Sequence, residues 1–381
     1  MMCRVAFLTA ALLVLAADLA PRPAVAQAIP QSLQESGPEA TLRQRKNAWT
    51  VGIVGGLIDG SSMRFVDELA KALDDGDDLR ILPIVSYGNA SNLEDLLYLH
   101  GVDAAVTQAD VFEYFRVERR TPNLAARVNY VLPLPMSDLH ILAREEIRTI
   151  QDLRGKKVNF GPPGSGSSLT GSIVFQRLGI PVEQVMTDQT NALHQLRSGA
   201  ISALIRVVTK PVDFFNKIPP GSGLHLLSVP FSKSMADYYG IGEFTEKDYP
   251  NLVPAGRTVD TVAVPSVLAV YNWPANHPRR AKIDRMVTRL FDNWDKLQKP
   301  PYHPKWRDIN PAATVPGWTR FPVAEQMLQK MRSDASSRQQ SSLRNEFQEF
   351  LTRSGAGAGG DREALFRQFL QWQQSRGAPP R

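Results

Sequence analysis

The sequence predicts an α/β fold with two lobes, each a mostly parallel sheet flanked by helices. Strand-like and helix-like segments alternate from residue 49 to 108, and the same order returns more loosely from residue 156 to 208. This alternation is typical of a parallel sheet with helices on its faces. Two further extended apolar segments, 139–147 and 261–272, stand where the chain could cross from one lobe to the other.

The elements of the first lobe follow from hydrophobic spacing. "WTVGIV", 49–54, is an apolar run that predicts a buried strand, and 79–85 and 102–108 predict two more. A glycine-rich stretch follows the first strand and opens a helix. Apolar residues recur at helical spacing between these strands, at Val66, Leu69, Ala70 and Leu73 and again at Leu93, Leu96 and Leu97.

The second lobe repeats this design. "KKVNF", 156–160, predicts a strand, followed by a glycine-rich loop and a helix over 168–179. A helix over 191–199 ends at a glycine, and 200–208 predicts the next strand. If 139–147 and 261–272 are both crossing strands, the first lobe is discontinuous, and the helix expected over 279–297 packs back on it.

The N-terminal residues have the features of a secretory signal peptide. Arg4 precedes the apolar run 5–20, and Ala24-Val25-Ala26 forms a small-residue cleavage site. The alternative is an uncleaved membrane anchor, but the run is shorter than the roughly 20 residues that a span needs. We therefore expect cleavage after about Ala26 and an exported, soluble mature protein.

We divide the rest of the chain by composition and pattern. Residues 322–381 are rich in Gln, Arg and Ser and predict two or three short helices in a partly flexible extension. The expected parts are a signal peptide at 1–26, a polar leader at 27–47, lobe one at 48–138 with 262–321, lobe two at 139–261, and the helical extension at 322–381.

Charge and residue counts exclude several classes of function. Cys3 is the only cysteine and lies in the signal peptide, so the mature chain has no disulfide, thiolate nucleophile or cysteine metal site. The six histidines show no metal-binding spacing, and we expect neither metal nor cofactor. The net charge of +6 suits a small anionic ligand or an anionic surface. No basic stripe with interleaved aromatic residues indicates nucleic-acid binding.

The loop "FGPPGSGSS", 160–168, resembles a phosphate-binding loop but has Ser167 where the pattern requires lysine. It follows a strand and opens a helix, so backbone N–H groups and the positive end of the helix dipole face the sheet edge. Hydrogen bonds and a partial charge suit one carboxylate or small oxyanion better than a nucleotide triphosphate with magnesium. The alternative is a loop whose serines only cap the helix.

The pattern I-x-x-L-x-G-K-x-V-x-x-G-x-x-G-S-G over 150–166, with "NALHQLRSGAISALI" and "TVAVPSVLAVYN" after it, resembles the TAXI family. These proteins are the extracytoplasmic solute receptors of tripartite, TRAP-type transporters. The resemblance covers about residues 49–300. It implies a two-lobed periplasmic binding protein of type II-like fold that closes on a small carboxylate and delivers it to a membrane permease.

Two stretches depart from the family's usual pattern. The motif G-G-T-Y-Y-P of the first lobe is replaced by "DGSSMR", 59–64, and the glycine-aromatic-proline loop of the second lobe by "VVTKP", 207–211. Both departures introduce a basic residue on a loop expected to face the ligand, namely Arg64 and Lys210.

The candidate ligand contacts lie where predicted strands end and helices begin. In lobe one they are Ser61, Ser62, Arg64, Tyr87, Asn89, Gln108 and Asp110. In lobe two they are Ser165, Gly166, Ser167, Ser168, Arg206, Thr209 and Lys210.

Several of these candidates have an alternative role. Ser61 or Ser62 could serve as a helix cap, Arg64 could be a solvated surface arginine, and Asp110 could cap the helix that follows it. Arg206 lies within a strand and could point into the cleft or away from it.

We therefore expect a monomeric periplasmic receptor that binds a small organic anion, such as an amino acid or carboxylate, and serves a TRAP-type permease. Two alternatives remain open. One is a ligand-sensing or scaffold protein that works with a sensor instead of a permease, and the other is a periplasmic hydrolase that uses a loop serine. No nucleophile, base and orienting group stand out as a catalytic set.

Overall fold

The computed structural model describes residues 37–76, 78–354 and 362–376. The predicted signal peptide, the first part of the leader and most of the linker "SGAGAGG" lie outside the described residues. The helix α1 (Pro38–Ala48) has no buried residue. Among the described helices, none combines the length and the apolar composition needed to cross a membrane.

The remaining elements alternate along the chain. The strands are β1 (Thr50–Gly56), β2 (Arg80–Val85), β3 (Ala104–Gln108), β4 (Val128–Arg144), β5 (Lys157–Asn159), β6 (Glu183–Val185), β7 (Ala203–Val208), β8 (Leu224–Leu226), β9 (Gly240–Thr245) and β10 (Thr258–Tyr271). The α-helices are α2 (Ser61–Leu73), α3 (Asn89–Tyr98), α4 (Ala109–Val117), α5 (Leu124–Arg127), α6 (Gly166–Arg177), α7 (Gln189–Ser198), α8 (Asp213–Asn216), α9 (Pro278–Asp292), α10 (Trp294–Leu297), α11 (Pro322–Ser354) and α12 (Arg362–Arg376). Short 3₁₀ helices are η1 (Ile150–Leu153), η2 (Lys233–Met235) and η3 (Pro304–Asp308).

The strands form one sheet in the order β2-β1-β3-β10-β4-β7-β5-β6, with β8 paired to β4 and β9 to β10. β1 runs parallel to β2 and β3, and β5 runs parallel to β6 and β7. The two antiparallel strands β10 and β4 lie between these parallel groups. The predicted α/β fold with two mostly parallel halves is confirmed.

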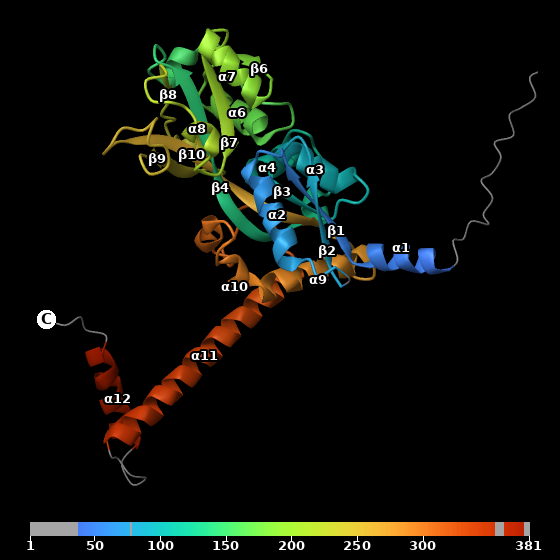
Figure 1. The fold of residues 1–381 in the computed structure, drawn as a ribbon, viewed down its shortest axis with the longest axis vertical. Coiled ribbons are helices and arrows are strands. Elements are labelled where there is room, and N and C mark those ends of the chain that lie inside the picture. Colours follow the sequence, from blue (N-terminus) through green and yellow to red (C-terminus); the bar gives the residue numbers. More distant parts are fainter. Residues whose placement is uncertain (1–36, 77, 355–361, 377–381) are drawn as a thin grey trace, which may run out of the picture. The chain divides into compact units, whose positions relative to one another are not determined.

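β4 and β10 are long because each serves both halves of the sheet (Figure 1). Near Val128 and Tyr271 the two strands pair with one another beside β3. Farther along, β4 pairs with β7 from Asp138 onward, and β10 pairs with β9 from Ala263 back to Thr258. We call the half around β1–β3 lobe one and the half around β5–β7 lobe two, with β4 and β10 as hinge strands.

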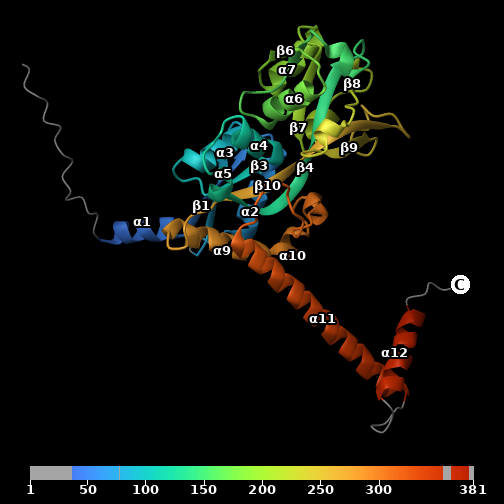
Figure 2. The same ribbon diagram turned by 180° about the vertical axis from the view of Figure 1, so that it is seen from behind.

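Helices cover both faces of each lobe, as Figures 1 and 2 show from opposite sides. In lobe one, α2 and α9 pack on one face through residues such as Leu69 and Val287, and α3 and α4 pack on the other. In lobe two, α6 covers one face through Phe175, and α7 covers the other through Leu196. Such two-sided cover explains why β1, β3 and β7 are buried along almost their whole length.

The C-terminal extension differs from the expected short helices. α11 is one helix of 33 residues, since the segment after Pro322 contains neither proline nor glycine to interrupt it. Only its first turns join the lobe-one core, through Ala324, Met327 and Leu328. Most residues from 332 to 352 are exposed.

Candidate functional site

Four helices from the two lobes begin at one small cavity. We call it the interlobe cavity; its volume is about 50 Å³. α2 and α3 of lobe one and α6 and α7 of lobe two direct their N-terminal residues to it. The first backbone N–H groups of a helix have no partner within the helix, and the helix dipole is positive there. The predicted residues in its lining are Ser61, Ser62, Asn89, Ser165, Gly166, Ser167 and Arg206.

The loop before α6 has the conformation that its glycines allow. Gly161 and Gly164 adopt φ values of 75° and 78°, which favour glycine. Ser165 is the N-cap, and its Oγ accepts from Ser168 N at 3.1 Å. Ser167 Oγ accepts from Val207 N at 2.9 Å. The expected helix thus begins two residues earlier, at Gly166, and this loop lies next to β7.

Two glycines beside this cavity lie where the lobes are in close contact. A Cβ on Gly166 would lie 2.6 Å from Asn89 Nδ2 and 2.7 Å from Gln108 Oε1, both in lobe one. A Cβ on Gly88 would lie 2.8 Å from Ser165 Cα in lobe two. Larger residues at these positions would hold the lobes apart, so the structure is a closed arrangement.

Arg206 supplies a positive charge at the cavity. It lies on β7, is almost fully buried, and places Nη2 at 2.6 Å from the carboxylate of Asp59 and 3.1 Å from the Asp59 carbonyl oxygen in lobe one. The guanidinium also lies over the Phe214 ring at 5.1 Å. The strand therefore turns Arg206 toward lobe one, and the ion pair joins the lobes.

Gln189 adds an acceptor that sequence reasoning missed. Its side chain is 8% exposed and lines the cavity from the first turn of α7. The Nε2 atom donates to the Ile205 carbonyl at 3.2 Å, and because a carbonyl only accepts, this contact assigns the amide orientation. Its Oε1 atom is buried and accepts no hydrogen bond from the described part of the chain. The sequence signal that could have identified Gln189 is its position as a polar residue in the first turn of a helix that follows a strand.

Asp110 and Gln108 connect the lobes instead of lining the cavity. Asp110 Oδ2 accepts from Thr170 Oγ1 at 2.7 Å and from Tyr239 OH at 3.0 Å, both in lobe two. Burial raises the pKa of the Asp110 carboxyl, although these hydrogen bonds oppose the shift. Gln108 is fully buried, and its Oε1 is 3.4 Å from Thr170 Oγ1. In the described chain Gln108 Nε2 has no partner.

Three other predicted residues lie away from the cavity. Arg64 is exposed and pairs with Glu68 one turn along α2, at 3.1 Å. Tyr87 is 69% exposed. Ser168 is buried in the first turn of α6, where its Oγ donates to the Ser165 carbonyl at 2.8 Å. The structure does not bring these side chains to the interlobe cavity.

Ser61 and Thr209 form another contact between the lobes. Gly60, not a serine, is the N-cap of α2, and it makes no side-chain cap bond. Ser61 Oγ instead accepts from Thr209 N at 3.2 Å. The hydroxyl of Ser61 therefore ties α2 to the end of β7.

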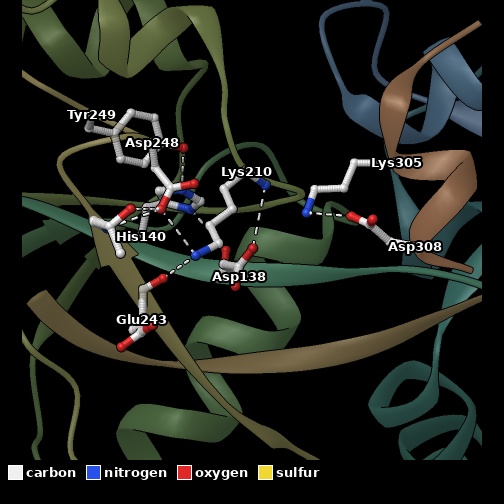
Figure 3. Close-up of polar contacts among 9 residues, drawn as sticks. Asp138, His140, Lys210, Glu243, Asp248, Tyr249, Lys305 and Asp308 are labelled. Carbon is white, nitrogen blue, oxygen red and sulfur yellow. Dashed lines mark hydrogen bonds and ion pairs between the residues drawn. The ribbon is translucent and has the colours of Figure 1, made fainter. Parts of the chain in front are cut away.

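Lys210 points away from the cavity toward β9. Its Nζ donates to the Glu243 carbonyl oxygen and lies 3.2 Å from Asp248 Oδ2 (Figure 3). Next to it, His140 is buried between the rings of Phe215 and Phe244. Burial lowers the pKa of His140 to about 3, so the ring is neutral near pH 7.

Within the described residues, no group of three or more His, Cys, Asp or Glu side chains is arranged to hold a metal ion. The three loop serines bond to backbone groups or to each other, as given above. Across the residues that the structure describes, no hydrogen bond joins a loop serine to a histidine. The chemistry that the site offers is therefore hydrogen bonding and positive charge toward an anion.

Residues 69–318, more than half of the chain, match the model of the NMT1-like family, and the chain belongs to that family. Solved structures with a similar fold include an amino acid ABC transporter substrate-binding protein, AbpA from Streptococcus pneumoniae, bound to L-arginine (TM-score 0.38, 14% identity, 67% of this chain and 95% of that one). Another is a TctC solute-binding protein from Polaromonas (TM-score 0.38, 17% identity, 65% and 88%). A histidine kinase sensor domain with similarity to periplasmic binding proteins also matches (TM-score 0.42, 14% identity, 70% and 99%). At these levels of similarity, none of them bears on the ligand of this chain.

Proposed function

We propose that the protein is an exported, monomeric receptor that binds a small organic anion in the interlobe cavity. The observation that carries this proposal is the convergence of four helix N-termini and the buried Arg206 on one space between two lobes. Helix N-termini attract anions, and a guanidinium pairs with a carboxylate or another oxyanion by charge-assisted hydrogen bonds.

Gln189 narrows the ligand class within this proposal. Its free Oε1 needs a hydrogen-bond donor, because a buried acceptor without a partner costs free energy. In a ligand with an amino or hydroxyl group beside its anionic group, the amino or hydroxyl group would donate to Gln189 Oε1. The anionic group would pair with Arg206 and the helix N-termini. Amino acids and hydroxy acids have this arrangement.

The closed arrangement limits the size of the ligand. A cavity of about 50 Å³ is far below the several hundred Å³ of typical drug-sized sites. Lobe opening about the hinge strands β4 and β10 would be needed for entry, and closure would then surround the ligand. The ligand fits the proposal best if it is small and becomes largely buried.

We also propose that the receptor belongs to the TAXI group and delivers its ligand to a TRAP-type permease in the periplasm. The pattern over 150–166 supports this finer assignment. The same proposal keeps the signal peptide at 1–26 and the lobe boundaries at 138/139 and 261/262, which fall within or near the hinge strands. Cell fractionation tests export. Recovery of the chain in the cytoplasmic fraction, and not in the periplasmic fraction, would count against it.

The test is thermal melting of residues 27–381 with amino acids, hydroxy acids, simple carboxylates, sulfonates and nucleotides. A ligand at about 100 times its dissociation constant should add about 2.7 kcal/mol to the free energy of unfolding. Stabilisation by one class of small anion supports the proposal. Lactate has a hydroxyl group that propionate lacks, so stronger stabilisation by lactate would support the role of Gln189 Oε1 as its acceptor. Gln195→Leu, on the same helix but outside the cavity lining, is the matched control for Gln189→Leu.

The long helix α11 favours one second candidate, a sensing or scaffold role. Most of its residues beyond 332 are exposed, and only its start belongs to the lobe-one core. An exposed helix of this length offers a surface for a protein partner. The test is a variant that ends after residue 331. If this variant still supports permease-dependent uptake but no longer supports signalling by the sensor, the sensing or scaffold role is supported. Loss of uptake with unchanged signalling would count against it.

A further inference from the structure

A second cavity lies over the hinge strands, away from the N-terminus of α6. It has a volume of about 620 Å³ and a floor made by β4 near Asp138 and by β10 near Ala263. One wall is the segment 305–313, whose Trp306 and Ile309 belong to the lobe-one core. The other wall is β9 with Thr209 and Lys210 of lobe two. We call this space the hinge groove; its volume is in the range of small-molecule sites.

The buried carboxylate of Asp138 faces this groove with most of its bonding capacity free. The residue is 6% exposed, yet it lines the groove. Within the described residues its carboxylate accepts one hydrogen bond, a long one of 3.4 Å from Lys210 N to Oδ2. A carboxylate has acceptor capacity for about four hydrogen bonds. In the described part of the chain, no ion pair includes Asp138.

The two lysines that line the groove are already engaged elsewhere (Figure 3). The ammonium group of Lys210 contacts the Glu243 carbonyl oxygen and Asp248 Oδ2. The ammonium group of Lys305 lies 3.0 Å from Asp308 Oδ2. Neither lysine therefore neutralises Asp138 by direct contact.

Two further carboxylates stand at the edge of the same groove. Asp260 on β10 and Glu243 on β9 are direct cross-strand neighbours, and both are exposed. Like charges directly opposite on a strand pair are destabilising unless a cation lies near them. Four acidic and two basic side chains line the groove, so its charge is negative although the whole chain is basic.

Apolar side chains complete the lining. Leu134, Met136 and Ile309 line the groove beside the hinge strands, and Ile241 is 76% exposed at its edge. These groups offer an apolar surface next to the carboxylate of Asp138. The combination suits a molecule with a positive end and an apolar body.

We propose that the hinge groove is a second ligand site, which takes a small organic amine with its ammonium group on Asp138 and its alkyl or aryl body against Leu134, Met136 and Ile309. The site is independent of the anion proposed for the interlobe cavity. Burial raises the pKa of Asp138 to about 6, so at neutral pH the carboxylate is ionised and ready to pair. Because both lobes form its walls, an amine in the groove would also be sensitive to lobe closure.

The experiment measures binding of n-butylamine and phenethylamine to the full mature chain by calorimetry and thermal melting. The pH is kept well above the pKa of Asp138. n-Butanol is the neutral match for n-butylamine. We expect both amines to bind and n-butanol not to bind. Asp138→Asn, which keeps the side-chain shape and an acceptor for Lys210 N, should weaken amine binding at least about tenfold.

Two variants distinguish amine binding at Asp138 from non-specific attraction of amines to negative charge on the surface. Asp295→Asn removes an exposed carboxylate on α10 and should leave amine binding unchanged. Glu243→Gln with Asp260→Asn should weaken binding less than Asp138→Asn does, because exposed charges are screened. Melting without amine confirms that each variant folds. The proposal is overturned if neither amine binds more tightly than n-butanol, or if Asp138→Asn binds amines as the wild type does.

Discussion

The guanidinium of Arg206 lies 2.6 Å from the carboxylate of Asp59, and this ion pair joins the two lobes beside the interlobe cavity. The side chain of Arg206 is 7% exposed, whereas that of Asp59 is 56% exposed. The arginine is therefore held in the protein, and the aspartate reaches it from the solvent side. An anion in the cavity would meet a charge that is already positioned but shared with Asp59.

Arg206 and Arg64 give opposite expectations for anion binding. Arg206→Gln removes the buried charge from the cavity lining and should weaken the stabilising anion about tenfold to a hundredfold, the usual range for hydrogen bonds to charged groups. Arg64→Ala removes only an exposed partner of Glu68 and should leave affinity unchanged, with a loss of stability below about 1 kcal/mol. Calorimetric titration of both variants checks this. Equal losses in the two would place the anion elsewhere.

Asp59→Asn should strengthen anion binding several-fold. The substitution removes a negative charge next to the cavity and releases a donor of Arg206 for the ligand. The free energy of unfolding should fall, because the substitution leaves the buried guanidinium of Arg206 without its ion-pair partner. Asp67→Asn, which breaks an exposed pair with Lys71 on α2, is the matched control. Weaker anion binding in Asp59→Asn would instead mean that Asp59 holds Arg206 in its binding orientation.

The local pattern of the sequence was sufficient for most elements of the lobes. Helical spacing at Val66 and Leu69 and the apolar runs of β1 and β7 depend on neighbours in the chain, and those elements form as expected. α11 is longer than its polar composition indicates, because neither proline nor glycine interrupts the segment after Pro322.

The site depended more on packing that sequence does not contain. Which face of β7 carries Arg206 is set by the register of β7 against β4, where Arg206 pairs with His140. Arg64 was a plausible ligand contact on a predicted loop, but α2 begins at Ser61 and brings it to Glu68 one turn later. Gln189 was missed because its helix begins two residues before the stretch that we identified.

Gly166→Ala should prevent full closure. An added Cβ would lie 2.6 Å from Asn89 Nδ2 and 2.7 Å from Gln108 Oε1, and both amides are buried. We expect a loss of anion affinity with a small change in the stability of each lobe, measured by titration and by small-angle scattering with ligand. Gly155→Ala is the contrast, since its φ of 69° strains alanine while its Cβ meets no neighbour. That variant should lose stability and keep affinity, and unchanged affinity in Gly166→Ala would contradict a closed binding state.

Asp138 and His140 should give the stability of the protein opposite dependences on pH. Burial raises the pKa of Asp138 to about 6, so the folded state holds this proton more tightly than the unfolded state does. The stabilisation is complete below the unfolded pKa of about 4 and is lost as the pH rises to about 6. Burial lowers the pKa of His140 to about 3, so its contribution is complete above about 6.5 and is lost as the pH falls toward 3.

Two variants separate these contributions in urea unfolding from pH 3 to pH 8. Between pH 4 and pH 6 the wild type should lose about 3 kcal/mol of its free energy of unfolding as Asp138 ionises. Asp138→Asn should not show this loss, because the amide does not ionise. His140→Gln should lose less stability than the wild type on acidification, by up to about 5 kcal/mol at pH 3. The Gln side chain can still bond to Tyr249, whose hydroxyl lies 2.7 Å from His140 Nε2. If both variants follow the wild-type pH profile in parallel, burial does not shift the pKa of either group in the folded state.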